Sequence, residues 1–271
     1  MNTVITGASD GIGAAAALQL ARMGHRLVLV GRTASKLAAV ADQVAEVAGD
    51  RPATLTADFT SFDDVRRLAG QLLERSESID VLVNNAGVMS TERQRTADGH
   101  ELMIQVNHLS PFLLTNLLLD RIRESSGRVV TTCSRAAKTG RLDPADLSRE
   151  RRRWSGWLQY GDSKQANALF TVSLAERGIA ATCAHPGVIR TGFAPGTFFM
   201  KLVLHVPGVG EPVEAGAARL VHLAAHQDGV DHPGRYFAGN APVEAPRQMS
   251  DPALAADLWT ASLAATGLPV S

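Results

Sequence analysis

The sequence predicts an α/β fold in which helices cover both faces of a seven-stranded, doubly wound parallel sheet. Short apolar runs rich in Val, Ile, Leu and Thr alternate with segments of helical length, as buried strands alternate with crossover helices. With 271 residues, 45% of them hydrophobic, and no break in composition, the chain is expected to form one domain. The expected strands span 3–6, 26–30, 53–57, 79–83, 128–132, 179–184 and 234–237, and the expected helices include 12–23, 34–48, 61–75, 100–124 and 160–177.

Local signals support several of these elements. Gly7 directly follows the first strand, where a residue without a side chain permits a tight turn into the first helix. Ser61 followed by Asp64 is typical of a helix start, because a hydroxyl caps free backbone N–H groups and an acid favours the first turn. The last run, 234–237, is the weakest strand candidate of the seven.

Charge and cysteine content exclude several classes of protein. The 27 Lys and Arg residues balance 27 Asp and Glu residues, so no general attraction to nucleic acid or to an anionic membrane is expected. Cys133 and Cys183 are too few for a disulfide framework or a four-cysteine zinc site, and they are expected to be buried thiols on neighbouring strands. Neither a secretory signal nor a spanning apolar segment is evident, and a cytoplasmic protein is expected.

The turn between the first strand and the first helix is rich in glycine. Gly7, Gly11 and Gly13 let the backbone turn tightly and approach a ligand, while the next helix points free N–H groups at the same place. This arrangement suits the pyrophosphate of a dinucleotide, although many tight turns look alike. After the second strand, Arg32 stands where an acid would bind the ribose of NAD, so the sequence favours the 2′-phosphate of NADP. The alternative is an arginine that only caps a loop.

Tyr160 and Lys164 are four residues apart and share one face of a predicted helix. A free tyrosine has a pKa near ~10, so it is a poor acid or base at neutral pH. A nearby ammonium group stabilises the phenolate; at ~4 Å the pair interaction is about 4 kcal/mol before desolvation. Lys164 is therefore expected to lower the pKa of Tyr160. The alternative is a surface pair, since this spacing is common by chance.

Several separated motifs, in a fixed order, resemble the short-chain dehydrogenase/reductase family. They are residues 6–13, Asp58, residues 84–87, Asn107, Ser134, Tyr160 with Lys164, and Pro186 with Gly187. The set covers residue 6 to about residue 237 and is far more specific than any one motif. Within this family, the chain is most similar to the retinol dehydrogenase and polyketide ketoreductase branch. The segments that carry this similarity are residues 106–109, 112–116, 163–167 and 258–259.

The resemblance implies a Rossmann-type fold and gives four residues catalytic roles. Tyr160 would donate a proton to a carbonyl oxygen or take one from an alcohol, and Lys164 would hold the nicotinamide ribose. Ser134 would orient the carbonyl, and Asn107 would fix a water that links Lys164 to solvent. Family members often have Asn-x-Ser-Ser at this strand end, whereas this chain has Cys133 directly before Ser134, so the register of Ser134 is in question.

The resemblance also implies a binding site for NADP(H). Asp58 is placed to meet the adenine amino group, and the small side chains at 85–87 would let the adenosine lie against the sheet edge. The alternatives are a helix-start acid and an ordinary turn. Residues 186–191 would hold the carboxamide. The full set of expected cofactor-binding residues is Gly7, Ser9, Asp10, Gly11, Ile12, Gly13, Arg32, Asp58, Phe59, Asn85, Ala86, Gly87, Tyr160, Lys164, Pro186, Gly187, Val188 and Thr191.

A lipophilic or polycyclic substrate is expected from the apolar segment 193–206, which lies where the family has a substrate-covering lid. The alternative is a helix packed on the core or on a second subunit. Trp154, Trp157 and Leu158 precede Tyr160 and are expected to line the same pocket.

The expected function is therefore NADP(H)-dependent reduction of a small-molecule ketone or aldehyde, or oxidation of the alcohol. Residues 1–125 would mainly bind the dinucleotide, and residues 126–271 would supply catalysis and substrate binding. A nucleotide-sugar epimerase or dehydratase and a non-catalytic NADP(H) sensor are the alternatives. A homodimer or homotetramer could form through helices 102–119 and 160–174.

Two polar clusters are given no function. The basic run 149–153 is expected to be a solvated face rather than a nucleic-acid patch. His222 and His226 are spaced to share a metal ion, but no third ligand at a fitting spacing is evident, so they are expected to be surface histidines. No metal is predicted.

Overall fold

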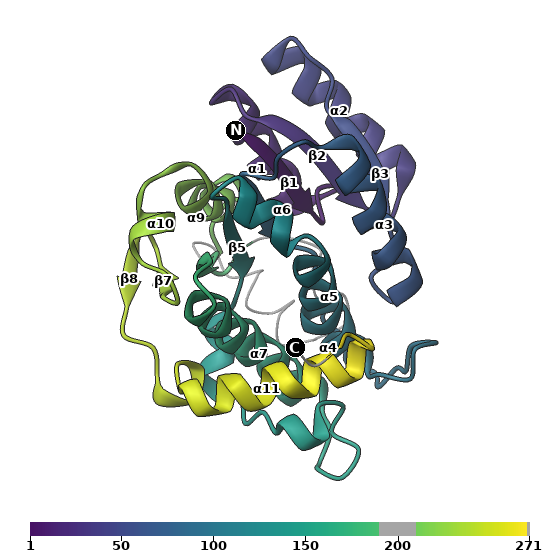
Figure 1. Cartoon of the computed structure of the whole chain (residues 1–271), viewed down its shortest axis with the longest axis vertical. Helices are drawn as coiled ribbons and strands as arrows, with labels where there is room; N and C mark the ends of the chain where they lie inside the picture. The colour runs from purple at the N-terminus through teal and green to yellow at the C-terminus, as the bar shows by residue number, and fades with distance from the viewer. Residues whose placement is uncertain (190–209, 270–271) are drawn as a thin grey trace.

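The computed structural model describes residues 1–189 and 210–269, and within them the chain forms one sheet with helices on both faces (Figure 1). The strand order is β3-β2-β1-β4-β5-β6-β7-β8. Seven strands are parallel, as expected, and an eighth adds to β7 in the antiparallel direction, which the sequence prediction missed. The strands are β1 (Asn2–Thr6), β2 (Arg26–Gly31), β3 (Ala53–Thr56), β4 (Val81–Asn84), β5 (Arg128–Thr132), β6 (Ala180–His185), β7 (Tyr236–Ala238) and β8 (Ala241–Val243).

The expected helices are present with small shifts, except that the single helix expected at 100–124 is divided into four parts. A π-helical turn, η1, interrupts it; this segment is buried on nearly all sides, so its apolar residues did not show where the turn lies. The helices are α1 (Gly11–Arg22), α2 (Ala34–Ala48), α3 (Phe62–Arg75), α4 (Leu102–Ile104), η1 (Gln105–Leu109), α5 (Ser110–Leu117), α6 (Leu119–Glu124), α7 (Gly156–Glu176), α9 (Val213–Ala225), α10 (Asp228–Asp231) and α11 (Pro252–Thr266).

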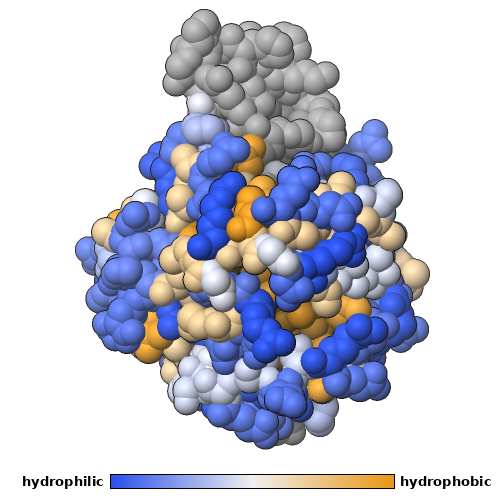
Figure 2. All heavy atoms as spheres, turned by 90° about the horizontal axis from the view of Figure 1, so that it is seen from above, coloured by the Kyte–Doolittle hydropathy of each residue, from blue (hydrophilic) through white to orange (hydrophobic). Residues whose placement is uncertain are grey.

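The two faces of the sheet carry separate hydrophobic cores. On one face α1, α2 and α9 bury Leu20, Leu37 and Leu220, and on the other α3 and α5 bury Leu68 and Phe112 together with α7. A sheet buried on both faces explains why its central strands are almost wholly apolar. Hydrophilic side chains predominate on the surface face shown in Figure 2. Among the helices of the described ranges, none combines the length and the apolarity that a membrane crossing requires.

The last helix, α11, packs along α7 (Figure 1). Its Trp259 ring lies 4.9 Å from the Phe112 ring and 6.0 Å from the Phe170 ring, and the Arg177 guanidinium stacks 3.6 Å from the indole. Such aromatic and cation–π contacts favour this one arrangement of α11. Parts of α5 and α7 that the sequence offered for self-association are therefore covered by α11 of the same chain.

The parallel strands place their carboxyl ends at one edge of the sheet. The chain crosses from one face to the other between β1 and β4, so the loops after these two strands diverge there. In open α/β sheets, ligands bind in the crevice at such a switch point. The loops after β1, β4, β5 and β6 therefore delimit the candidate site.

Glu101 sets the start of the segment that runs from α4 through η1 to α5. Its buried carboxylate accepts hydrogen bonds from the Met103 and Ile104 N–H groups, at 2.8 and 3.0 Å. Burial raises the pKa of Glu101 from 4.5 to about 7, and the two N–H groups oppose this rise. The folded chain therefore holds this proton at pH values where the unfolded chain has released it.

We expect Glu101→Gln to stabilise the chain relative to wild type as pH rises. The contribution of Glu101 to stability is fully present below pH 4.5 and is lost as pH rises through about 7, whereas the amide has no charge to bury. Urea unfolding at pH 5 and pH 8 measures the difference, which should grow by on the order of 2 kcal/mol. Exposed Glu46→Gln is the control and should show no such trend. A difference that stays constant with pH would contradict the argument.

Candidate functional site

The glycine-rich turn joins β1 to α1 with a backbone that only glycine adopts easily. Gly7 and Gly11 have φ values of +66° and +54°. A side chain at Gly13 would overlap the carbonyl oxygen of Gly7, so the turn and the first helical residues are in close contact. The N-terminus of α1 therefore points its backbone N–H groups toward the turn, where the Asp10 carboxylate caps the Gly11 N–H at 2.7 Å.

The loop after β4 is tied directly to this turn. The hydroxyl oxygen of Thr6 accepts hydrogen bonds from the N–H groups of Asn85 and Ala86, at 3.0 and 3.1 Å. The Asn85 amide nitrogen lies 3.1 Å from the Thr6 carbonyl oxygen and 3.3 Å from that of Gly7, and its amide oxygen accepts from the Thr132 hydroxyl at 3.2 Å. Asn85, expected at the adenosine, thus braces three strand ends against each other.

Positive charge lies beside the glycine turn. Arg32 is exposed directly after β2, and a side chain at the neighbouring Gly31 would lie 3.1 Å from the Ser9 Cβ and Oγ atoms. Lys36 donates to the Asp10 carboxylate at 2.9 Å, a hydrogen bond that lowers the pKa of Asp10. These residues place two cations and a hydroxyl around the end of β2, which fits a phosphate group.

The chain after β3 contains Asp58 and Phe59, both expected at the adenine. The Asp58 carboxylate accepts hydrogen bonds from the N–H and the hydroxyl of Thr60, at 2.9 and 2.8 Å. Phe59 is buried, and its carbonyl oxygen accepts from the Ser110 hydroxyl at 2.7 Å. The Asp58 side chain thus stabilises its own turn, and α5 holds the turn in place.

Tyr160 and Lys164 lie on the buried face of α7, at the carboxyl edge of the sheet. The Lys164 Nζ atom is 5.8 Å from the centroid of the Tyr160 ring and donates to the Thr132 carbonyl oxygen at 3.1 Å. Ser134 is hydrogen-bonded to Tyr160, and its hydroxyl also accepts from the Ala136 N–H at 3.2 Å. The expected register of Ser134 is therefore consistent with the geometry, and Cys133 is a buried free thiol, as is Cys183.

The pKa of Tyr160 is raised, whereas the sequence prediction was a lowered value. Burial is the largest cause, and the Ser134 hydrogen bond opposes it. Burial also lowers the pKa of Lys164 to about 8. The prediction was wrong in direction because burial penalises the phenolate more than the Ser134 hydrogen bond stabilises it, an effect that residue spacing cannot show.

Asn107, in the π-helical turn η1, holds the loop after β4. Its amide oxygen accepts from the Val88 N–H at 2.7 Å, and its amide nitrogen lies 3.0 Å from both the Val88 carbonyl oxygen and the Ser163 hydroxyl. A side chain at Gly87 would lie 3.5 Å from Lys164 Nζ and 3.2 Å from Asn107. Both ends of the Asn107 side-chain amide thus contact protein atoms, and the water that this residue is expected to fix stays a prediction.

The loop after β6 is held from α9. Arg219 donates to the Pro186 carbonyl oxygen and pairs with Glu211 at 2.5 Å, and the Glu211 N–H donates to the Val188 carbonyl oxygen at 2.7 Å. Gly187 has a φ of +99°, where other residues are strained. Thr191 and the apolar segment 193–206 lie outside the described residues.

The surroundings of Tyr160 are mostly apolar. Met103, Ala136 and Tyr160 form a buried cluster against which Trp154 and other partly buried apolar residues pack. The Trp157 side chain is 52% exposed, and its ring centroid lies 6.4 Å from that of Tyr160. Leu158 is half-buried on the same helix. An apolar, partly open surface thus adjoins the phenol.

Comparison with known proteins agrees with this geometry. Residues 1–198 match the family model described as short chain dehydrogenase. The chain belongs to the short-chain dehydrogenase family. A 268-residue alignment is 42% identical to the protein named "Putative daunorubicin C-13 ketoreductase DnrU" of Streptomyces sp. (strain C5), covering 97% of this chain and 92% of that one. Human retinol dehydrogenase 13 is 33% identical, with 98% and 84% covered.

Solved structures support the same family assignment. The crystal structure of an uncharacterised protein from Mycobacterium paratuberculosis has a TM-score of 0.79 and 33% identity, with 99% of this chain and 95% of that chain covered. A short chain dehydrogenase from Escherichia coli CFT073, solved in complex with NADPH, has a TM-score of 0.69 and 25% identity, with 89% and 96% covered. This short-chain dehydrogenase is thus an oxidoreductase that acts on CH–OH and C=O groups with a nicotinamide cofactor.

In this short-chain dehydrogenase, the basic run before α7 is only in part the solvated face that the sequence predicted, because Glu150, Arg151 and Arg153 are exposed but the other two arginines are not. Arg149 is buried and forms two hydrogen bonds, of 2.8 and 3.0 Å, with the fully buried carboxylate of Asp162. Arg152 lies 2.9 Å from Asp146. A charge run without helical or strand periodicity carries no signal for such pairing, and Asp162 was not singled out. The pair fixes the loop before α7 to the turn of helix that carries Tyr160 and Lys164.

We expect Asp162→Asn to destabilise the chain by about 3–5 kcal/mol, because it leaves the buried Arg149 charge without its partner. Urea unfolding gives the free energy. The double variant Arg149→Met, Asp162→Leu should recover part of the loss, because no buried charge remains. Asp42→Asn, which breaks the exposed pair with Arg51, is the matched control and should cost under about 1 kcal/mol. Equal losses for Asp162→Asn and Asp42→Asn would contradict the argument.

Proposed function

We propose that the chain is an NADP(H)-dependent ketoreductase that reduces a ketone or aldehyde on a lipophilic or polycyclic substrate, or oxidises the alcohol. The observation that carries the proposal is the group of Ser134, buried Tyr160 and buried Lys164, which lies at the same sheet edge as the glycine turn. A proton donor and a dinucleotide-binding turn at one crevice are what carbonyl reduction requires.

The residues around the glycine turn fit NADP(H). Gly7, Gly11 and the N-terminus of α1 would hold the pyrophosphate, and Arg32 would pair with the 2′-phosphate next to Ser9. Residues 186–188, held by Arg219, would face the nicotinamide side of the crevice. When bound, the nicotinamide supplies or accepts the hydride. The NADPH complex of the related E. coli enzyme supports this choice of cofactor.

The proton would be moved by Tyr160. Burial raises the pKa of its phenol, so the hydroxyl stays protonated at neutral pH and can donate to a carbonyl oxygen as negative charge develops there. The Ser134 hydroxyl, bonded to Tyr160, would hold the same carbonyl oxygen. Lys164, fixed by the Thr132 carbonyl, would stabilise the phenolate that remains after proton transfer.

The apolar surface beside Tyr160 favours an apolar substrate. Trp157 and Trp154 would contact its hydrocarbon part, and the exposed Val188 lies in the loop across the crevice. Two similar proteins are named for daunorubicin and for retinol, which are both lipophilic compounds. This likeness supports a lipophilic substrate class for this chain.

We expect Tyr160→Phe to lower turnover of a carbonyl substrate by roughly 10²–10⁴-fold, because it removes the proton donor. NADPH binding should stay within a few-fold of wild type. NADPH consumption with a panel of ketones and aldehydes measures the first, and NADPH fluorescence titration the second. The chain has two tyrosines, so Tyr236→Phe is the matched control and should keep its activity. Full activity of Tyr160→Phe would disprove the mechanism.

We expect Arg32→Asp to shift the cofactor preference toward NADH. Loss of the guanidinium and gain of a carboxylate should lower the NADPH-to-NADH ratio of kcat/KM by roughly 10- to 100-fold. Arg26→Asp changes an exposed arginine at the opposite end of β2 and should leave the ratio unchanged. An unchanged ratio for Arg32→Asp would mean that another residue recognises the phosphate.

A further inference from the structure

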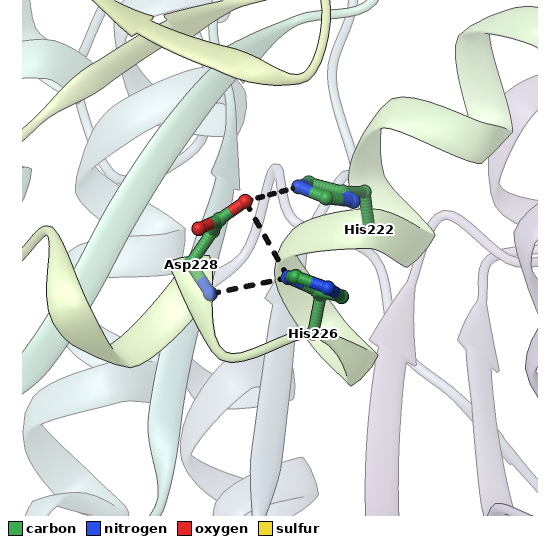
Figure 3. A group of neighbouring side chains, drawn as sticks. All are labelled: His222, His226 and Asp228. Atoms are coloured by element: carbon green, nitrogen blue, oxygen red, sulfur yellow. Dashed lines mark hydrogen bonds and ion pairs between the residues drawn. The ribbon is translucent and has the colours of Figure 1, made fainter.

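A second group of polar side chains lies away from the catalytic crevice, where α9 meets α10 (Figure 3). His222 lies in the last turn of α9, His226 caps the C-terminus of that helix, and Asp228 is the first residue of α10. The Asp228 Oδ2 atom lies 2.7 Å from His222 Nε2 and 3.4 Å from His226 Nδ1. The three ligand atoms lie within 4.8 Å of one another.

From the sequence, only the two histidines of this group could be recognised as neighbours. His222 and His226 are one helical turn apart, and their rings stack at a centroid distance of 4.6 Å and an angle of 18°. Asp228 follows the end of α9, where the chain reverses, so helical periodicity could not place it. Sequence spacing offered no third ligand, and the turn between α9 and α10 is what brings a carboxylate to the two histidines.

One ring nitrogen in this group, His226 Nδ1, lies close to both a hydrogen-bond donor and an acceptor of Asp228. The Asp228 N–H points at His226 Nδ1 from 3.4 Å, and in the neutral ring this nitrogen accepts that proton with its lone pair. The same nitrogen lies 3.4 Å from the Asp228 carboxylate oxygen. With the ring in that tautomer, two acceptor atoms, His226 Nδ1 and the Asp228 carboxylate oxygen, lie 3.4 Å apart. A cation bound by both would turn this repulsion into attraction.

We propose that His222, His226 and Asp228 bind a divalent cation of the zinc class. Ligand atoms about 2.0–2.2 Å from tetrahedral zinc are about 3.3 Å apart, which the His226–Asp228 distance already matches. The 2.7 Å contact between His222 and Asp228 would open by roughly half an ångström, which a partly exposed carboxylate allows. His232 Nε2 lies 3.9 Å from the other carboxylate oxygen, Asp228 Oδ1, and is outside the group of three ligand atoms.

The position of this site predicts a structural effect. α10 contacts β5 and β6, and Arg128, the first residue of β5, donates to the His226 carbonyl oxygen at 2.6 Å. The cluster therefore lies at the amino ends of these strands, opposite the edge that holds Tyr160. A bound cation would tie α9 to α10 and stabilise the fold without touching the reacting groups. The nearby Arg128 guanidinium and the exposure of His226 favour micromolar rather than tighter binding.

The test uses tag-free protein stripped with a chelator, because a polyhistidine tag would bind the same ions. Calorimetric titration with Zn²⁺ should give one site per chain, and saturating Zn²⁺ should raise Tm by about 5 °C. Co²⁺ should give the visible absorption bands of a tetrahedral nitrogen and oxygen site. The proposal would be overturned if calorimetry detected no Zn²⁺ binding, or if the Co²⁺ spectrum showed a thiolate band, which would mean that the cysteines bind the ion.

Variants then locate the site. His226→Ala and Asp228→Asn should each weaken Zn²⁺ binding by at least about 100-fold, since loss of even an outer partner costs 10–100-fold. His226 is largely exposed, so the metal-free Tm of its variant should match wild type. Asp231→Asn changes a carboxylate on the same short helix, bonded to Gln227, and should bind Zn²⁺ as wild type does. Wild-type affinity in His226→Ala and Asp228→Asn would overturn the proposal.

Discussion

The burial of α7 is the constraint on which the rest of the structure depends. Tyr160, Asp162, Ser163 and Lys164 follow each other closely on this helix, and all four are inside the protein. Buried polar groups are stable only with partners, and a buried charge without one is costly. Each partner comes from a different element: the Thr132 carbonyl for Lys164, Asn107 for Ser163 and Arg149 for Asp162. A rotation of α7 would break all three contacts together, so they hold the helix in one orientation.

The carboxyl edge of the sheet is braced by short polar side chains that bind backbone atoms. Thr6 and Asn85 connect β1 to the loop after β4, and Asn107 connects that loop to α7 through Ser163. These side chains contact the inner side of the glycine turn, where Asn85 binds the Gly7 carbonyl oxygen, while Ser9, Asp10 and Gly11 stay partly or wholly exposed. The same edge is therefore rigid in its backbone and open to a ligand, which a dinucleotide site requires.

Burial also governs the protons at the site. It lowers the pKa of Lys164 to about 8 and raises that of Tyr160, and removal from water is the largest cause of both shifts. The phenol keeps its proton at neutral pH as a result. A proton donor that is protonated before reaction, with an ammonium nearby to accept the resulting charge, suits the reductive direction.

The sequence by itself determined the order of strands and helices, the glycine turn, the position of Arg32 and the grouping of Tyr160 with Lys164. These features depend on periodicity, on glycine conformation and on helical spacing, which are local properties of the chain. Tertiary structure decided the π turn at Asn107, the antiparallel strand β8, the Arg149–Asp162 pair and the approach of Asp228 to His222 and His226. It also decided the direction of the Tyr160 pKa shift. Each of these depends on which surfaces exclude water and on where turns redirect the chain. Residue spacing along the sequence indicates neither property.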